Sequence, residues 1–159
     1  AGTTELQRTY LRMCGPASDA DVVSFLGTSR TAVGRDRPGN RVAVRVDGRT
    51  AYSSREQVEA ISRAAGPDSV RLLPPSDPWL SARDREVVVP DAAHRRRIWV
   101  SIGAPGVVLA GVDVVGLWRT RQKGRTLRVE TEWFGAPVDV GAEAARLAVV
   151  RGAGDVTVV

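Results

Sequence analysis

The sequence predicts an α+β fold in two parts: helices with a β-hairpin over residues 1–66, then a β-rich part over residues 67–159. Three observations carry this. Short helical patterns with capping residues precede a strong hairpin signal, alternating apolar runs fill the second half, and a proline-rich stretch lies between them. With 43% apolar and 26% charged residues, the composition is that of a globular protein.

Three short helices are predicted at the start of the chain. The first is expected to bury one apolar face, which consists of Leu6, Tyr10, Leu11, Met13 and Cys14. Ser18 is a suitable N-cap for a second helix over residues 19–26, which Gly27 would end. Ser29 or Thr31 can cap a third, short helix over residues 30–35.

A β-hairpin follows, because alternating valines over residues 41–46 precede Asp47-Gly48, a dipeptide typical of tight hairpin turns. The order of three helices and then a hairpin predicts a winged-helix module, the helix-turn-helix variant that carries a wing. A connector helix is expected next, with Ser53 or Ser54 as its N-cap and Val58 and Ile61 on its buried side.

The stretch "LLPPSDPWLSARDR" over residues 72–85 opens the second part. Its three prolines oppose helix, so we expect it to run extended or turn, as a rigid strap between the two parts. Trp79 and Leu80 are expected in a core.

The remaining chain predicts a small antiparallel sheet or partial barrel with covering helices. Extended chain is expected at residues 86–90 and a basic helix at residues 91–99. Three strands of a meander, a helix at 140–150 and a last strand at 155–159 complete it.

The net charge of +5 favours a polyanionic partner. An alternative is open, because only Lys123 among the 23 basic residues is lysine, and such a bias for arginine can reflect a GC-rich genome.

The best candidate for contact with DNA is the predicted hairpin near residue 124. Its positive side chains are Arg119, Arg121, Lys123, Arg125 and Arg128. A basic hairpin can lie along a groove and neutralise phosphates. Alternatively, Arg119 and Arg121 pair with Glu130 and Glu132 on the next strand.

Further candidates lie on the predicted third helix (Arg30, Arg35) and the wing (Arg45, Arg49). Arg83 and Arg85 follow on the proline-rich stretch, where neighbouring acids could pair with them. No Asn or Gln is placed for adenine readout, so we expect recognition of phosphates and shape. Winged helices also serve as protein–protein modules, which leaves that alternative open.

The sequence predicts no catalytic residue, no cofactor and no metal site. It has no P-loop, GxGxxG, GxSxG or HExxH motif, and one cysteine and one histidine supply too few zinc ligands. No apolar run is long enough to cross a bilayer, and the N-terminus does not resemble a signal peptide, so we expect a cytoplasmic protein.

The segments "LLPPSDPWL", "RDR" and "GVVLAGVDVVGLWR" within residues 72–121 resemble the C-terminal half of the bacterial AlkZ and YcaQ type DNA glycosylases. The resemblance implies tandem winged-helix modules followed by a β-rich domain, and further N-terminal domains of the same polypeptide. The family's catalytic Gln-x-Gln pair has no counterpart here, because Gln7, Gln57 and Gln122 are all far apart in sequence.

We therefore expect the DNA-binding C-terminal region of a bacterial winged-helix protein, which grips duplex DNA mainly through phosphates. The full-length protein would then be a candidate DNA-repair glycosylase, while this chain alone would not be an enzyme. The alternative is a protein–protein interaction scaffold that does not bind DNA.

Overall fold

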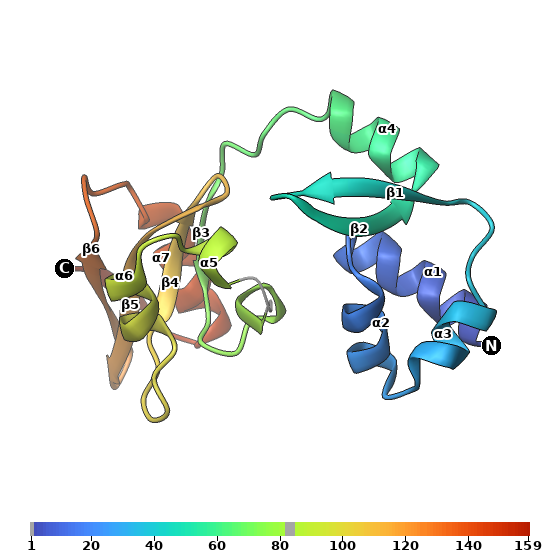
Figure 1. Ribbon diagram of the computed structural model, residues 1–159. Coiled ribbons are helices and arrows are strands. Elements are labelled where there is room, and N and C mark those ends of the chain that lie inside the picture. The colour runs from blue at the N-terminus through green and yellow to red at the C-terminus, as the bar shows by residue number, and fades with distance from the viewer. Residues whose placement is uncertain (1, 82–84) are drawn as a thin grey trace. The chain divides into compact units, whose positions relative to one another are not determined.

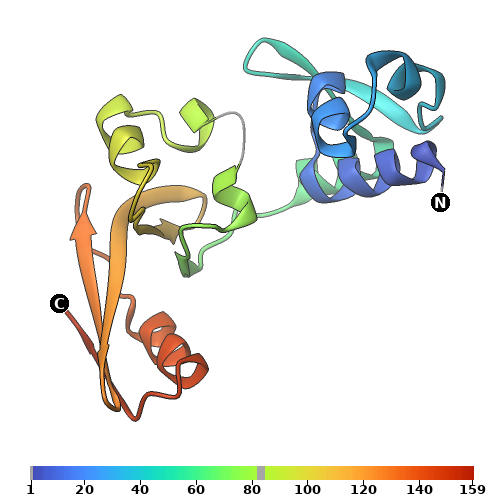
Figure 2. The same cartoon turned by 90° about the horizontal axis from the view of Figure 1, so that it is seen from below.

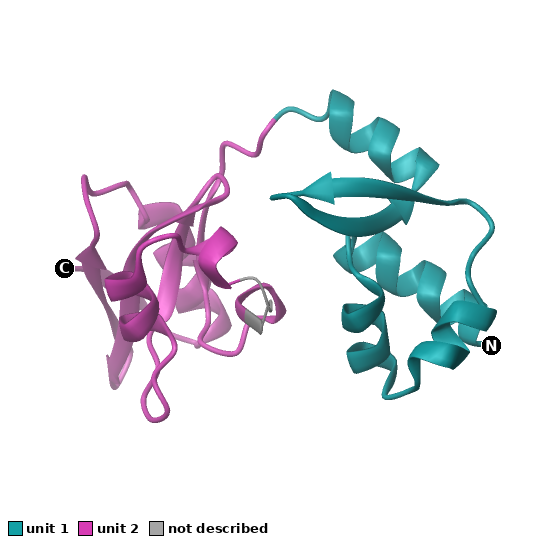
Figure 3. Cartoon of the chain, in the orientation of Figure 1, with its two compact units in different colours: residues 1–65 teal, residues 66–159 magenta. Residues whose placement is uncertain are grey.

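The computed structural model describes residues 2–81 and 85–159. The chain forms two compact units, residues 1–65 (unit 1) and residues 66–159 (unit 2), shown in Figure 3. The elements of unit 1 are α1 (Thr3–Cys14), α2 (Asp19–Leu26), α3 (Arg30–Arg35), β1 (Arg41–Val46), β2 (Arg49–Ser54) and α4 (Arg55–Arg63). Those of unit 2 are β3 (Val70–Leu73), the 3₁₀ turn η1 (Pro78–Ser81), α5 (Arg85–Val88), α6 (Ala92–Ile98), β4 (Gly106–Ala110), β5 (Asp113–Lys123), β6 (Thr126–Trp133), α7 (Gly141–Val150) and β7 (Asp155–Val158). The predicted α+β class is confirmed (Figure 1).

The predicted caps of unit 1 are present. The Ser18 hydroxyl accepts a hydrogen bond from the Asp21 amide, and the Asp21 carboxylate accepts one from the Ser18 amide, which forms a capping box at α2. Gly27 ends α2 in the left-handed conformation, with φ of 60°. Ser29, rather than Thr31, caps α3.

The β1–β2 hairpin pairs antiparallel from Arg41 opposite Ser54 to Val46 opposite Arg49. Its turn residues Asp47 and Gly48 both have positive φ, 46° and 76°. Positive φ at both central positions is the turn geometry that matches the twist of paired strands. The local sequence therefore sets this hairpin.

The buried face of α1 was predicted wrongly. Leu6 and Met13 are 46% and 74% exposed and Cys14 is exposed, whereas Gln7 is fully buried. The Gln7 side-chain amide donates hydrogen bonds to the carbonyls of Val33 (3.2 Å) and Asp36 (3.1 Å). These carbonyls lie at the C-terminal end of α3, where helix geometry leaves acceptors without partners. A buried polar side chain on α1 is therefore needed to bond them, although the apolar pattern of α1 did not predict one.

The buried side of α4 was also predicted wrongly, because Ile61 is 55% exposed and no residue of α4 is buried. The helix is held at its first turn instead. The Gln57 side-chain amide donates to the Arg12 carbonyl of α1 over 2.9 Å, and Ser54 caps the helix.

Unit 2 contains a sheet in the order β3-β4-β5-β6-β7. All neighbours pair antiparallel, as predicted, except β6 and β7, which are parallel and depart from the predicted antiparallel sheet. The reason is the connection: α7 lies between these two strands in the sequence, and a crossover through a helix returns the chain to the end where β6 began (Figures 1 and 2).

An apolar core lies on each face of the sheet. Adjacent residues on β4 and β5 enter different cores: Val108 and Trp118 pack with α7, whereas Val107 and Leu117 pack with α5, α6 and η1. Side chains alternate along a strand, so every second residue of β5 lies on the α6 side of the sheet. Farther along β5, the side chains on this side are polar.

The proline-rich stretch belongs to unit 2 itself. Leu72 and Leu73 lie in β3, and Leu80 is 3% exposed in the core, as expected. Pro78 begins a 3₁₀ turn, which agrees with the expected turn. One expectation was wrong: residues 85–88 form the short helix α5, although extended chain was predicted over residues 86–90. Proline tolerates the first position of a helical turn, and so short an apolar run does not distinguish strand from helix.

Candidate nucleic-acid interface

The β5–β6 hairpin carries the strongest concentration of the predicted site residues. Its strands pair without interruption from Gly116 opposite Trp133 to Lys123 opposite Thr126. Gly124, with φ of 59°, makes the tight turn. The backbone carbonyl of Arg125 accepts hydrogen bonds from the amides of Gly154 (2.7 Å) and Asp155 (3.2 Å) at the start of β7, which anchors the tip.

The basic side chains of this hairpin share one face of the sheet. Leu117 packs toward α6, and alternation along β5 and cross-strand pairing with β6 bring further side chains to the same face. We call this set the basic face: Arg119, Arg121, Lys123 and Arg128. Two acids, Glu130 and Glu132, share it.

Glu130 lies between two of these arginines. Its Oε1 is 3.4 Å from Arg121 Nε and 3.3 Å from Arg128 Nε. The predicted alternative pairing is therefore present for Arg121, whereas Glu132 pairs with Arg97 of α6. The Arg121 side chain is 79% exposed, so this contact is a surface ion pair worth at most about 1 kcal/mol and is readily exchanged.

The other charges near the tip are not neutralised. Within residues 2–81 and 85–159, no acid lies within ion-pair distance of Arg119, Lys123 or Arg125. All three residues are exposed. The hairpin therefore keeps three positive charges for an external partner.

The basic helix α6 beside this face has divided roles. Asp91 caps it, and the amides of His94 and Ala93 that donate to the carboxylate lower the Asp91 pKa. Arg95 is occupied internally, since it donates to the carbonyls of Val89 and Pro90. The His94 ring stacks on the Phe134 ring, with ring centroids 3.7 Å apart.

The candidates of unit 1 are spread over two places. Arg30 and Arg35 begin and end α3, and Arg35 pairs with Asp36 over 3.2 Å. Arg45 and Arg49 flank the hairpin turn at the other end of the unit, as both Figure 1 and Figure 2 show. All four are exposed, but the structure does not bring them together into one patch.

Asp19 pairs with two other arginines of unit 1, and the sequence alone did not predict this pairing. Asp19 accepts from Arg41 over 2.7 Å and from Arg37 over 2.8 Å. The Arg41 side chain is only 5% exposed, and its guanidinium lies 3.3 Å from the Tyr52 ring centroid. Partial burial by itself raises the pKa of Asp19, but the hydrogen bonds and charges of Arg41 and Arg37 outweigh it and lower that pKa.

The candidates on the proline-rich stretch have different outcomes. Arg83 lies outside the described residues. Arg85 begins α5, and its guanidinium lies 4.8 Å from the centroid of the Trp99 ring. A guanidinium over an aromatic ring can still bind a phosphate, although the ring already occupies one face of the guanidinium.

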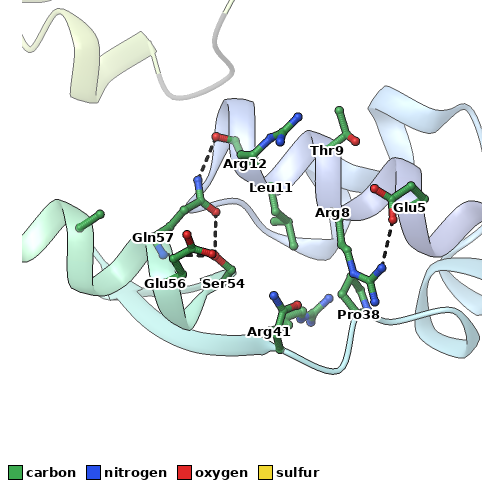
Figure 4. Close-up of a pocket in the computed structure, with 12 residues that line it drawn as sticks. Glu5, Arg8, Thr9, Leu11, Arg12, Pro38, Arg41, Ser54, Glu56 and Gln57 are labelled. Carbon is green, nitrogen blue, oxygen red and sulfur yellow. Dashed lines mark hydrogen bonds and ion pairs between the residues drawn. The ribbon is translucent and has the colours of Figure 1, made fainter.

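Unit 1 also contains a cavity of about 300 Å³ among α1, α4 and the start of β1 (Figure 4). Its charges are mixed: Arg8 pairs with Glu5 over 3.0 Å, and Glu56 lies on the opposite wall. Three arginines and two glutamates line it, and none of the lining residues is a nucleophile with an adjacent base, so the cavity does not indicate a reaction.

Each of the three glutamines hydrogen-bonds to backbone carbonyls. Gln7 and Gln57 bond backbone carbonyls in unit 1, and Gln122 donates to the Gly124 and Arg151 carbonyls at the hairpin. In the described part of the chain, no three residues of His, Cys, Asp or Glu come together as a metal site. No described helix has the length and apolar character that a membrane span requires.

The chain is similar to known DNA glycosylases. The family profile of "DNA glycosylase AlkZ-like" matches residues 1–153. No curated protein sequence matches the chain. Among solved structures, the DNA glycosylase AlkZ of Streptomyces sahachiroi is similar, with a TM-score of 0.72 and 24% identity over 99% of this chain. The match covers 45% of that protein, so the chain spans less than half its length.

Proposed function

The chain belongs to the AlkZ-like DNA glycosylase family, and on this premise we propose that it is the DNA-binding portion of a DNA-repair glycosylase. In this proposal it holds duplex DNA mainly through backbone phosphates. The observation that carries the proposal is the exposed basic face of the β5–β6 hairpin, with unneutralised charges at its tip.

The charges on the hairpin favour DNA binding over the alternative that the basic residues only reflect genomic composition. If the arginine content were only a genomic bias, we would expect acids to neutralise the basic side chains. Glu130 pairs with both Arg121 and Arg128 and offsets one of their two charges, but Lys123 and Arg125 at the tip have no ion pair among the described residues. A rigid tip with free charges can neutralise several phosphates and release their counterions.

Unit 1 is proposed to be a winged-helix module, and unit 2 a β-rich domain of partial-barrel type. The order α1, α2, α3, β1, β2 and the short capped helices support the first assignment. Because α3 and the hairpin turn lie at different ends of unit 1, we propose that Arg30 and Arg35 contact DNA separately from Arg45 and Arg49. For unit 1, these contacts would be with phosphates.

Binding of a labelled duplex of about 20 base pairs, followed by fluorescence anisotropy at low salt, tests the proposal. The double variant Arg121→Ala with Lys123→Ala should weaken binding by about tenfold or more, since two charge-assisted contacts are lost. The matched control is Arg55→Ala with Arg63→Ala, which removes two exposed positive charges from α4. Equal losses in both variants would contradict a specific role for the hairpin.

A second candidate function, a protein-interaction scaffold, rests on exposed apolar side chains of unit 1. Met13 and Phe25 are 74% and 63% exposed, and Phe25 packs against Tyr10 with ring centroids 4.5 Å apart. Failure of the wild-type chain to bind duplex DNA at low salt would leave this as the better account.

A further inference from the structure

A second cavity, of about 440 Å³, lies beside the basic face in unit 2. It sits where Leu117 and Arg119 of β5 pair with Glu132 and Glu130 of β6, next to the C-terminal turn of α6. Arg96 and Arg97 of α6 contribute to its lining. Three arginines therefore meet two carboxylates around one hollow.

Two of the three arginines are available to a ligand. Arg96 and Arg119 are exposed, and neither makes an ion pair within the described part of the chain. Arg97 pairs with Glu132 and remains 41% exposed. Because its Nη2 is engaged by a surface carboxylate, an incoming anion can displace that partner at little cost.

The elements that carry these arginines are fixed in place. Ile98, at the end of α6, is 2% exposed, and the Trp99 indole N–H donates to the Leu80 carbonyl over 2.9 Å. On the opposite wall, Leu117 is 6% exposed and belongs to the same core. Guanidinium groups on rigid elements lose little freedom when a ligand binds.

We infer that this cavity binds one backbone phosphate of duplex DNA, with Arg96 and Arg119 as its direct contacts and Arg97 recruited from Glu132. The inference rests on the proposed DNA-binding function and extends the interface from the hairpin to α6. A guanidinium presents paired N–H donors that match two oxygens of a phosphate, and the low cost of breaking the Arg97–Glu132 pair allows the exchange. Glu132 then acts as a competitor that weakens binding to the phosphate.

The experiment measures affinity of the complete chain for a duplex of about 20 base pairs over a range of salt concentrations. Each phosphate contact contributes about 0.9 to the log–log slope, so the loss of one phosphate contact in Arg96→Ala with Arg119→Ala should reduce the slope by about 1. Glu132→Gln should tighten binding severalfold. The far-UV circular dichroism and tryptophan fluorescence of each variant verify that unit 2 is intact.

The outcomes separate this inference from the proposed function. No binding by the wild-type chain would overturn both. A wild-type chain that binds DNA, is weakened by Arg121→Ala with Lys123→Ala, and keeps its full slope without Arg96 and Arg119 would overturn the cavity alone. Titration with inorganic phosphate is the second arm: binding of free phosphate that Arg96→Ala with Arg119→Ala abolishes, without any change in the DNA slope, would overturn the assignment to DNA.

Discussion

Arg121 of β5 lies directly opposite Arg128 of β6, and both guanidinium groups approach the same oxygen, Oε1 of Glu130, at 3.4 Å and 3.3 Å. Like charges in a cross-strand pair repel, so the carboxylate is what allows them to face each other. One carboxylate thus holds two guanidinium groups together at the centre of the basic face. The same carboxylate lowers the positive charge that this face presents to a phosphate.

Glu130→Gln is expected to tighten DNA binding severalfold while lowering the stability of unit 2. Removal of the carboxylate frees Arg121 and Arg128 for phosphates but leaves them opposed, at a cost of about 0.5–1 kcal/mol in the free energy of unfolding. Anisotropy with a labelled duplex and urea unfolding followed by tryptophan fluorescence measure the two effects. Unchanged or weaker DNA binding would show that these two arginines do not contact DNA.

Asp19→Asn is expected to destabilise unit 1 by about 2 kcal/mol near neutral pH, because the buried Arg41 guanidinium loses its counter-charge. The pKa of Asp19 is lowered in the folded chain, so its charge stabilises unit 1 fully above the ordinary aspartate value of 3.8. That contribution is lost as the pH falls from 3.8 through the lowered pKa. Unfolding of wild type and variant by circular dichroism, at neutral and acidic pH, should therefore converge in acid; a difference that persists there would contradict this account.

Gln7→Ala is expected to destabilise unit 1 by about 2–3 kcal/mol, since it removes two hydrogen bonds and leaves a space in the core. Gln7→Leu restores the volume and isolates the contribution of hydrogen bonding. All four tryptophans lie in unit 2, so their fluorescence is an internal control that should not change. Amide exchange in α1 and α3 is the readout; protection equal to wild type in Gln7→Leu would mean that the amide bonds contribute nothing.

Gly106→Ala is expected to destabilise unit 2 by about 3 kcal/mol. An added Cβ would lie 2.3 Å from Trp118 Nε1 and 2.6 Å from the Leu73 carbonyl, the two groups that form a 2.9 Å hydrogen bond across β3 and β5. Gly135→Ala is the matched control, because a Cβ there meets nothing within 4 Å. Urea unfolding followed by tryptophan fluorescence should separate the two variants, and equal midpoints would contradict the crowding around Gly106.

Features that depend on a few adjacent residues could be predicted from the sequence. The cap at Ser18, the Asp47-Gly48 turn and the turn at Gly124 follow from local side-chain hydrogen bonding and positive φ, and the structure has all three. The basic hairpin could also be located, because its turn and its charges lie close together in the sequence.

Features that depend on partners distant in the sequence could not be predicted from it. Leu6 and Ile61 fit an apolar helical face, but exposure is decided by which elements pack against the helix. The pairing of Arg41 with Asp19 joins residues 22 positions apart, so the local sequence did not indicate it. Glu130 lies opposite Arg119 in the strand register, and only the side-chain geometry shows that it contacts both Arg121 and Arg128.

The most direct test of the account is the salt dependence of duplex DNA binding by the complete wild-type chain. If the basic face and the neighbouring cavity neutralise about four or more phosphates, the logarithm of the affinity should fall with the logarithm of salt concentration with a slope of about −4 or steeper. A chain that does not bind at low salt, or that binds with a slope near zero, would contradict phosphate recognition by this surface.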